Sequence, residues 1–202
     1  MNSLGSSTVA AITSAYRVDS IIMLPIVNAG TAVSIFTSRS LGEGDSVKAK
    51  RCLKVGSLMN FICSLFLVFV AYFAGGFFVS LFGISQESAI IGRDFFRAIS
   101  IFYILFGLSM SMRGYLEGCG HVVFSGIAGV SSLIVRISLS YILLPLFGNT
   151  VIAYAEAFSW CYLCLFFFVG IIYFNYKNNR NLAGNNNLAG NNKLFDDERI
   201  EN

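Results

Sequence analysis

The feature that most constrains this chain is a recurring stretch of about 20 residues without a charged side chain. The first stretch covers residues 20–38, and a second, longer one lies between Lys54 and Glu87. A helix of about 20 apolar residues crosses the roughly 30 Å hydrocarbon core of a bilayer. Only 12% of the 202 residues are charged, whereas soluble domains carry about 25%. We therefore expect an all-α integral membrane protein.

Five segments have the length and apolarity of transmembrane helices. The predicted spans are residues 11–37, 55–74, 97–112, 122–144 and 153–174. We expect the small, polar residues 1–10 to form an outer loop or the outer end of a helix that is missing from this chain. Residues 175–202 are polar, rich in Asn and contain a tandem copy of NLAGNN, so we expect a disordered tail.

Two glycine-rich loops join predicted spans on one side of the membrane. Gly42 and Gly44 in the first loop, and Gly118 and Gly120 in the second, are candidates for the positive φ angle with which helices often end. Pro25 lies inside the first span and removes a backbone donor, so we expect it to kink that helix.

The distribution of basic residues predicts the orientation of the chain. The two glycine-rich loops and the tail hold ten of the fourteen Lys and Arg residues. Cytoplasmic loops are enriched in these residues, so we expect the N-terminus outside the cell and the C-terminus in the cytoplasm, with the protein in the plasma membrane. Because the bases flank membrane spans, the net charge of +3 indicates a lipid bilayer rather than nucleic acid as the partner.

Several segments resemble the multidrug and toxic compound extrusion (MATE) family. They are AAITSAYRVDSI, the P-x-x-N-A-G-T-A pattern that follows, the SLGEGD loop, RGYLEGCGH and GVSSLIVRISLSYIL. The resemblance extends over about residues 3–174 and implies five of the twelve helices of a two-lobed antiporter, helices 8–12. It also implies export of amphipathic cations and other toxic compounds by Na⁺ or H⁺ antiport. The N-terminal lobe would come from the same or another polypeptide.

Charged side chains at membrane depth are costly, so each is a candidate site residue. Asp19, Arg136 and Glu156 lie at similar heights when 1.5 Å per residue is counted from the inner ends of their spans. The family resemblance implies a Glu four residues before this arginine, where the chain has Ser132. We therefore expect Arg136 to pair across helices with Asp19 or Glu156, or else to extend to the outer headgroups.

Asp19 is the best candidate for a functional acid. Its carboxylate would bind a coupling cation or attract a cationic substrate at the outer mouth of the chamber, or it would be a structural partner of Arg17 or Arg136. Further candidates could line a chamber for flat cations through their polar groups and ring faces, or, for the tyrosines, act as anchors at the membrane interface. These candidates are Tyr16, Asn28, Tyr103 and Tyr141.

Three interpretations of function follow. The first is part of a secondary transporter for drugs or toxic cations. The second is a related exporter of lipid-linked or polysaccharide precursors, and the third is an accessory membrane subunit without transport of its own. The sequence has no paired carboxylates, catalytic triad or metal cluster, so we expect neither an enzyme nor a cofactor other than the coupling ion, Na⁺ or H⁺.

Overall fold

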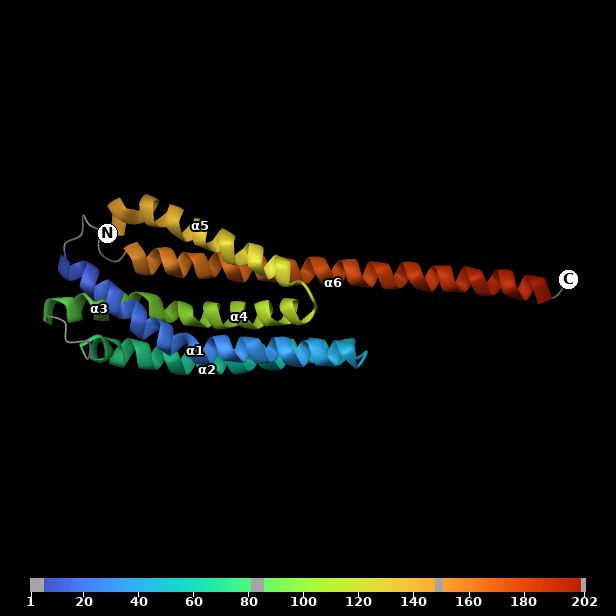
Figure 1. Ribbon diagram of the computed structural model, residues 1–202, viewed down its shortest axis with the longest axis horizontal. Helices are drawn as coiled ribbons and strands as arrows, with labels where there is room; N and C mark the ends of the chain where they lie inside the picture. Colours follow the sequence, from blue (N-terminus) through green and yellow to red (C-terminus); the bar gives the residue numbers. More distant parts are fainter. Residues whose placement is uncertain (1–5, 81–85, 148–150, 201–202) are drawn as a thin grey trace. The chain divides into compact units, whose positions relative to one another are not determined.

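The computed structural model describes residues 6–80, 86–147 and 151–200, and all regular structure in these ranges is helical (Figure 1). The elements are α1 (Ser6–Gly42), α2 (Ser46–Ser80), α3 (Gln86–Ile99), the short 3₁₀ helix η2 (Ser100–Phe102), α4 (Tyr103–Gly118), α5 (Val122–Phe147) and α6 (Val151–Ile200). The chain divides into two compact units, residues 1–167 and 168–202.

Five helical segments in the described ranges are long and apolar enough to cross a bilayer. They are Ile12–Gly42, Ser46–Phe78, Ile90–Gly118, Val122–Leu144 and Val151–Lys177. The predicted class, an all-α membrane protein with five spans, is therefore confirmed. Figure 1 shows α1 changing direction part-way along its length, and Pro25 is the proline inside this helix.

The third predicted span, residues 97–112, is too short. The structure combines α3, η2 and α4 into one span, Ile90–Gly118. The prediction began the span at residue 97 because Arg93 and Arg97 make α3 look too polar for a membrane span. In the structure these arginines are exposed on α3, whereas Phe95 and Phe96 are buried.

The second predicted span, residues 55–74, is also too short, since α2 continues to Ser80. The glycines near its end allow α3 to approach closely. A Cβ atom on Gly75 would lie 2.7 Å from Cβ of Phe96. Glycine is unfavourable inside an isolated helix, but tertiary packing of this kind outweighs the propensity.

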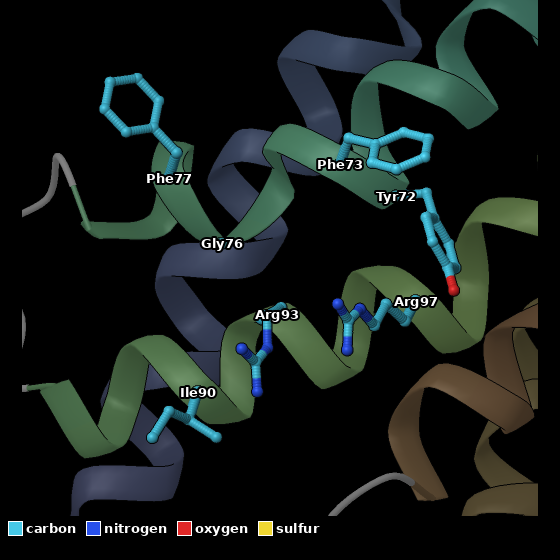
Figure 2. A pocket seen from close by; sticks show the side chains of 7 residues that line it. All are labelled: Tyr72, Phe73, Gly76, Phe77, Ile90, Arg93 and Arg97. Atoms are coloured by element: carbon cyan, nitrogen blue, oxygen red, sulfur yellow. The ribbon is translucent and has the colours of Figure 1, made fainter.

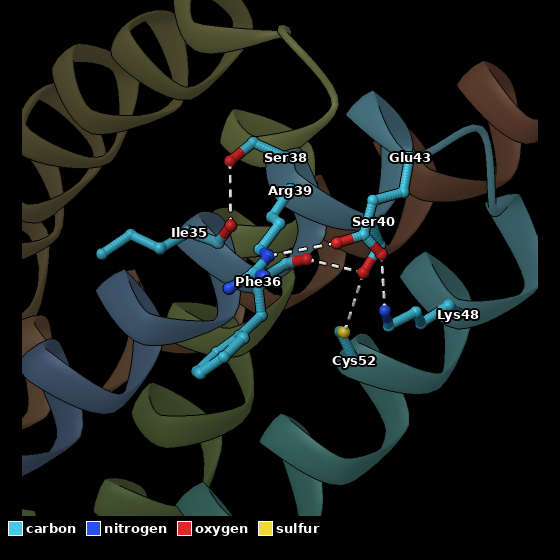
Figure 3. A network of polar contacts seen from close by, with 8 residues as sticks. All are labelled: Ile35, Phe36, Ser38, Arg39, Ser40, Glu43, Lys48 and Cys52. Atoms are coloured by element: carbon cyan, nitrogen blue, oxygen red, sulfur yellow. Dashed lines mark hydrogen bonds and ion pairs between the residues drawn. The ribbon is translucent and has the colours of Figure 1, made fainter.

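A network of charged side chains holds the first glycine-rich loop (Figure 3). Glu43 accepts hydrogen bonds from Lys48 at 2.6 Å and from Arg39 at 3.1 Å. These bonds, that of Lys48 first, hold the pKa of Glu43 below its ordinary value. Asp45 caps α2 by accepting a hydrogen bond from the backbone N–H of Lys48 at 2.8 Å. Gly44 makes the turn itself, with φ of +78°.

The second glycine-rich loop has a comparable construction. Arg113 donates a hydrogen bond to Glu117 Oε1 at 2.7 Å, and the Ser125 hydroxyl donates to the same oxygen at 2.5 Å. Gly120 makes the turn, with φ of +87°. Thus the loop of each pair of helices is tied by an i,i+4 Arg–Glu pair and one left-handed glycine.

Two of the four predicted turn glycines have other roles. Neither Gly42 nor Gly118 has a positive φ. Gly42 is the last residue of α1. Gly118 belongs to the contact between α4 and α1, where its Cβ would lie 2.6 Å from the Ser34 carbonyl oxygen.

Small residues bring α1 and α4 into backbone contact. A Cβ atom on Gly114 would lie 2.1 Å from the carbonyl oxygen of Gly30, and one on Gly30 would lie 2.8 Å from that of Met110. Close approach at small residues is a common way for membrane helices to pack. It sets the distance and rotation of α1 against α4, on which the polar cluster described below depends.

The second unit, residues 168–202, is helical in the structure to Ile200, whereas we predicted disorder from residue 175. Asn and Gly are poor helix formers, which was the basis of that prediction. Extending an existing helix avoids the cost of nucleating a new one, which offsets part of this low propensity.

Candidate functional site

Asp19 and Tyr103 form a buried hydrogen-bonded pair between α1 and α4. The Tyr103 hydroxyl donates a short hydrogen bond to Asp19 Oδ1. Asp19 is 3% exposed, and Tyr103 is completely buried. A buried carboxylate is costly unless it is hydrogen-bonded or paired, so the tyrosine is what allows this acid to lie within the helix packing.

Arg136 of α5 and Glu156 of α6 form an ion pair between helices. Arg136 Nη1 lies 2.5 Å from Glu156 Oε1. This confirms the predicted pairing and selects Glu156, because Asp19 lies outside ion-pair distance of the arginine. Ser132, at the position where the family resemblance implies a Glu, instead donates a hydrogen bond to its own helix, at the Gly129 carbonyl.

The second oxygen of Glu156 is unsatisfied. Oε2 is buried and accepts no hydrogen bond of ordinary length and angle from the described residues, although the Tyr16 hydroxyl lies close enough to the Glu156 carboxylate to interact with it. The side chain is only 8% exposed, whereas that of Arg136 is 37% exposed. The pair is thus asymmetric: the acid lies within the packing, while the base reaches its surface. A buried carboxylate oxygen without a donor is an acceptor that a proton or a small cation could satisfy.

Charged and aromatic groups surround this acid. Tyr16, Asp19 and Arg136 all lie close enough to Glu156 to interact with it electrostatically. Tyr16 also packs edge-on against Phe95 of α3, with ring centroids 5.5 Å apart. The helices α1, α4, α5 and α6 contribute to one polar cluster, which we define as Tyr16, Asp19, Tyr103, Arg136 and Glu156.

A cavity of about 480 Å³ adjoins this polar cluster. Tyr16, Arg136 and Tyr141 line it together with apolar residues of α5 and the start of α6, including Leu133 and Ile137. It therefore offers two aromatic rings, one positive charge and an apolar wall. Such a lining suits an amphipathic molecule with a flat ring system.

The structure places two sequence candidates, Asn28 and Arg17, away from the polar cluster, and gives Tyr103 another role than the predicted one. Asn28 is exposed on α1, nine residues beyond Asp19, which corresponds to about 14 Å along a helix. Arg17 is exposed as well and forms no ion pair with Asp19. Tyr103 does not line the cavity as we expected, because it is buried against Asp19.

Sequence reasoning missed the aromatic support of the cluster. Trp160, the single tryptophan of the chain, lies 5.9 Å from Tyr103 and 5.0 Å from Phe106 between ring centroids. It is 4% exposed and orients the tyrosine that binds Asp19. Trp160 lies one helical turn after Glu156, so the sequence alone could have indicated that it packs beside the cluster. Among the described residues, no group of three or more His, Cys, Asp or Glu side chains could hold a metal ion.

Comparison with known proteins gives consistent matches. The family model described as MatE matches residues 1–142. The chain is 27% identical, over 133 residues, to the "Probable multidrug resistance protein YoeA" of Bacillus subtilis (strain 168), covering 66% of this chain and 29% of that protein. The chain thus spans less than a third of the length of this relative.

Solved structures show the same fold. A crystal structure of MATE in the bent conformation matches with a TM-score of 0.77 and 20% identity, covering 82% of this chain and 37% of that one. An inward-facing multidrug resistance MATE family transporter of the MOP superfamily matches with a TM-score of 0.72 and 19% identity, covering 81% and 38%. The matched proteins are transporters, which agrees with the prediction that this chain is not an enzyme.

Proposed function

The chain belongs to the MatE family, and we propose that it builds one lobe of a secondary transporter that exports amphipathic cations in exchange for Na⁺ or H⁺. The observation that carries this proposal is a pair of buried acids, Asp19 and Glu156, next to a cavity with an aromatic and apolar lining. Relatives named as multidrug resistance proteins support the substrate class. They favour neither the exporter of lipid-linked or polysaccharide precursors nor the accessory subunit.

We assign the five spans to helices 8–12 of a twelve-helix transporter. The chain covers 37% of the matched MATE structure, which is in keeping with about five of twelve helices. The opposite wall of the substrate chamber would come from the N-terminal lobe, carried by the same or another polypeptide. Secondary transporters commonly bind substrate where two such repeats meet.

The coupling step we propose uses the asymmetry of the ion pair. A proton or Na⁺ on Glu156 satisfies its free oxygen and weakens its hold on Arg136. The guanidinium, which lines the cavity, then contributes an unbalanced positive charge there. That charge disfavours a bound cation resting on Tyr16 and Tyr141. Coupling ion and substrate therefore oppose each other, as antiport requires.

Asp19 extends this negative field toward α4 and is the second binding position for the coupling ion. Tyr103 donates a hydrogen bond to the Asp19 carboxylate, and this carboxylate lies within electrostatic reach of Glu156 and Arg136. For orientation, we propose a plasma-membrane protein with its two glycine-rich loops and C-terminus in the cytoplasm, supported by the bases that these segments carry.

The test is efflux by the complete transporter, this chain together with its N-terminal lobe, carrying Asp19→Asn. Asparagine keeps an oxygen that can accept the Tyr103 hydrogen bond but removes the charge. We expect cells with this variant to accumulate ethidium as cells without the transporter do. The amount of protein in the membrane should stay at the wild-type level.

Asp45→Asn is the matched control, because asparagine caps a helix about as well as aspartate. It removes one carboxylate from the first glycine-rich loop, far from the polar cluster in sequence, and should leave efflux unchanged. Wild-type efflux by Asp19→Asn, or equal losses in both variants, would contradict the proposed role of this acid.

A further inference from the structure

A second cavity, of about 510 Å³, lies between the last turns of α2 and the exposed face of α3 (Figure 2). Three aromatic side chains of α2, Tyr72, Phe73 and Phe77, line one side, and Arg93 and Arg97 of α3 line the other. Figure 2 shows both arginine side chains leaving neighbouring turns of α3. The function proposed above makes no use of this cavity.

The arginines of this cavity are incompletely neutralised. Arg93 Nε lies 3.8 Å from Oδ1 of the adjacent Asp94, a long contact between two side chains that are about half exposed. Within the described ranges, Arg97 has no carboxylate at ion-pair distance; its guanidinium carbon lies 5.5 Å from the centroid of the Tyr72 ring. The α3 part of the span, residues 90–99, thus carries two positive charges and one negative charge. It belongs to a segment, Ile90–Gly118, that is apolar enough to span a bilayer.

A net positive charge at the membrane calls for an anion. Side chains four residues apart on a helix lie about 5–6 Å apart at their Cβ atoms, so Arg93 and Arg97 can both reach one phosphate. The planar guanidinium group matches two phosphate oxygens at once. A single phosphate diester carries one negative charge, which balances the excess of this segment.

The α2 side of the cavity indicates what the phosphate is attached to. Phe73 is 74% exposed and Phe77 is 63% exposed, on a helix that spans the bilayer. These rings offer an apolar surface to an acyl chain, from which an inorganic phosphate ion would gain nothing. The aliphatic stem of Arg93 packs against α2 at Gly76, where an added Cβ atom would lie only 3.1 Å from the Cβ of Arg93. The basic and apolar halves are therefore packed together before a ligand arrives.

We propose that this cavity binds an anionic glycerophospholipid, with the phosphate on Arg93 and Arg97 and an acyl chain along Phe73 and Phe77. A zwitterionic lipid such as phosphatidylcholine carries its own ammonium group next to the phosphate and cannot neutralise the arginines equally well. The bound lipid would join the end of α2 to α3, whose other face packs against the remaining helices through Phe95 and Phe96.

Native mass spectrometry of the purified 202-residue chain in mild detergent tests the proposal. Phosphatidylglycerol, phosphatidylcholine and inorganic phosphate are added in separate arms, and retained molecules are counted. We expect phosphatidylglycerol to be retained about tenfold more strongly than phosphatidylcholine, a ratio that corresponds to 1.4 kcal/mol. Arg93→Gln combined with Arg97→Gln should abolish this preference.

Lys54→Gln is the control for loss of a positive charge, because Lys54 is exposed at the other end of α2. It should retain phosphatidylglycerol as the wild type does. Arg97→Lys keeps the positive charge but removes the planar guanidinium group, so it should weaken the retention of phosphatidylglycerol without affecting folding. This variant tests the proposal even if the double variant does not fold. Equal retention of both lipids by the wild type, a preference for phosphatidylglycerol that persists in the double variant, or retention of inorganic phosphate as strong as that of phosphatidylglycerol would overturn the proposal.

Discussion

The close contact between α1 and α4 yields a quantitative prediction for Gly114→Ala. The new Cβ atom would lie 2.1 Å from the Gly30 carbonyl oxygen, about 1.3 Å short of the 3.4 Å at which ordinary contact begins. Its next neighbours are also backbone atoms, of Gly30 and Ser34, so no flexible side chain can move aside. The two helices must separate, and a gap of about 0.5–1 Å already forfeits a quarter to a half of the dispersion energy of facing atoms.

Overpacking of this kind costs about 3 kcal/mol, the upper part of the usual range, because the obstacle is backbone. Alanine is a better helix former than glycine by about 1 kcal/mol, which offsets part of the cost. The net loss of about 2 kcal/mol lowers the unfolding temperature of a chain of this length by about 4–8 °C. Thermal unfolding of the purified chain in detergent measures the shift.

Gly126→Ala in α5 is the matched control, since nothing lies within 4 Å of the position that its Cβ would take. This variant gains helix propensity without a clash, so its unfolding temperature should equal or exceed that of the wild type. Unfolding of Gly114→Ala at the wild-type temperature, or destabilisation of both variants alike, would refute the role of the glycines in setting the helix distance.

Two further predictions concern charges. Arg136→Gln leaves the buried Glu156 carboxylate unpaired and should lower the free energy of unfolding by about 2–3 kcal/mol. The loss is smaller than for a fully buried ion pair, because the arginine is partly exposed. The double variant Arg136→Gln with Glu156→Gln should recover most of this loss when the single and double variants are compared by thermal unfolding. The second prediction concerns Glu43, whose pKa is lowered by Lys48 and Arg39. The ion pairs of Glu43 therefore stabilise the fold at pH values above the ordinary Glu pKa of about 4.3, and this stabilisation is lost as the pH falls through the lowered pKa. The corresponding decrease in unfolding temperature at acid pH should disappear in Glu43→Gln, and a decrease that persists there would exclude this source.

What the sequence determined by itself is the class of the protein and the number of its spans. Both depend on local quantities, the length of an apolar run and the scarcity of charge, which need no knowledge of neighbouring helices. The same reasoning left two outcomes for Arg136, a carboxylate on another helix or the outer headgroups, because a guanidinium cannot lose its charge. It also found two of the turn glycines, Gly44 and Gly120.

Only the tertiary structure decided which partners meet. The hydrogen bond to Asp19 comes from Tyr103, 84 residues away, and the partner of Arg136 is Glu156 rather than Asp19. Similar height along the membrane normal made both acids possible partners. The choice between them depends on how far each helix is rotated about its axis and how closely it approaches its neighbour. Those quantities are set by contacts such as that between Gly30 and Gly114, which are invisible in either helix alone.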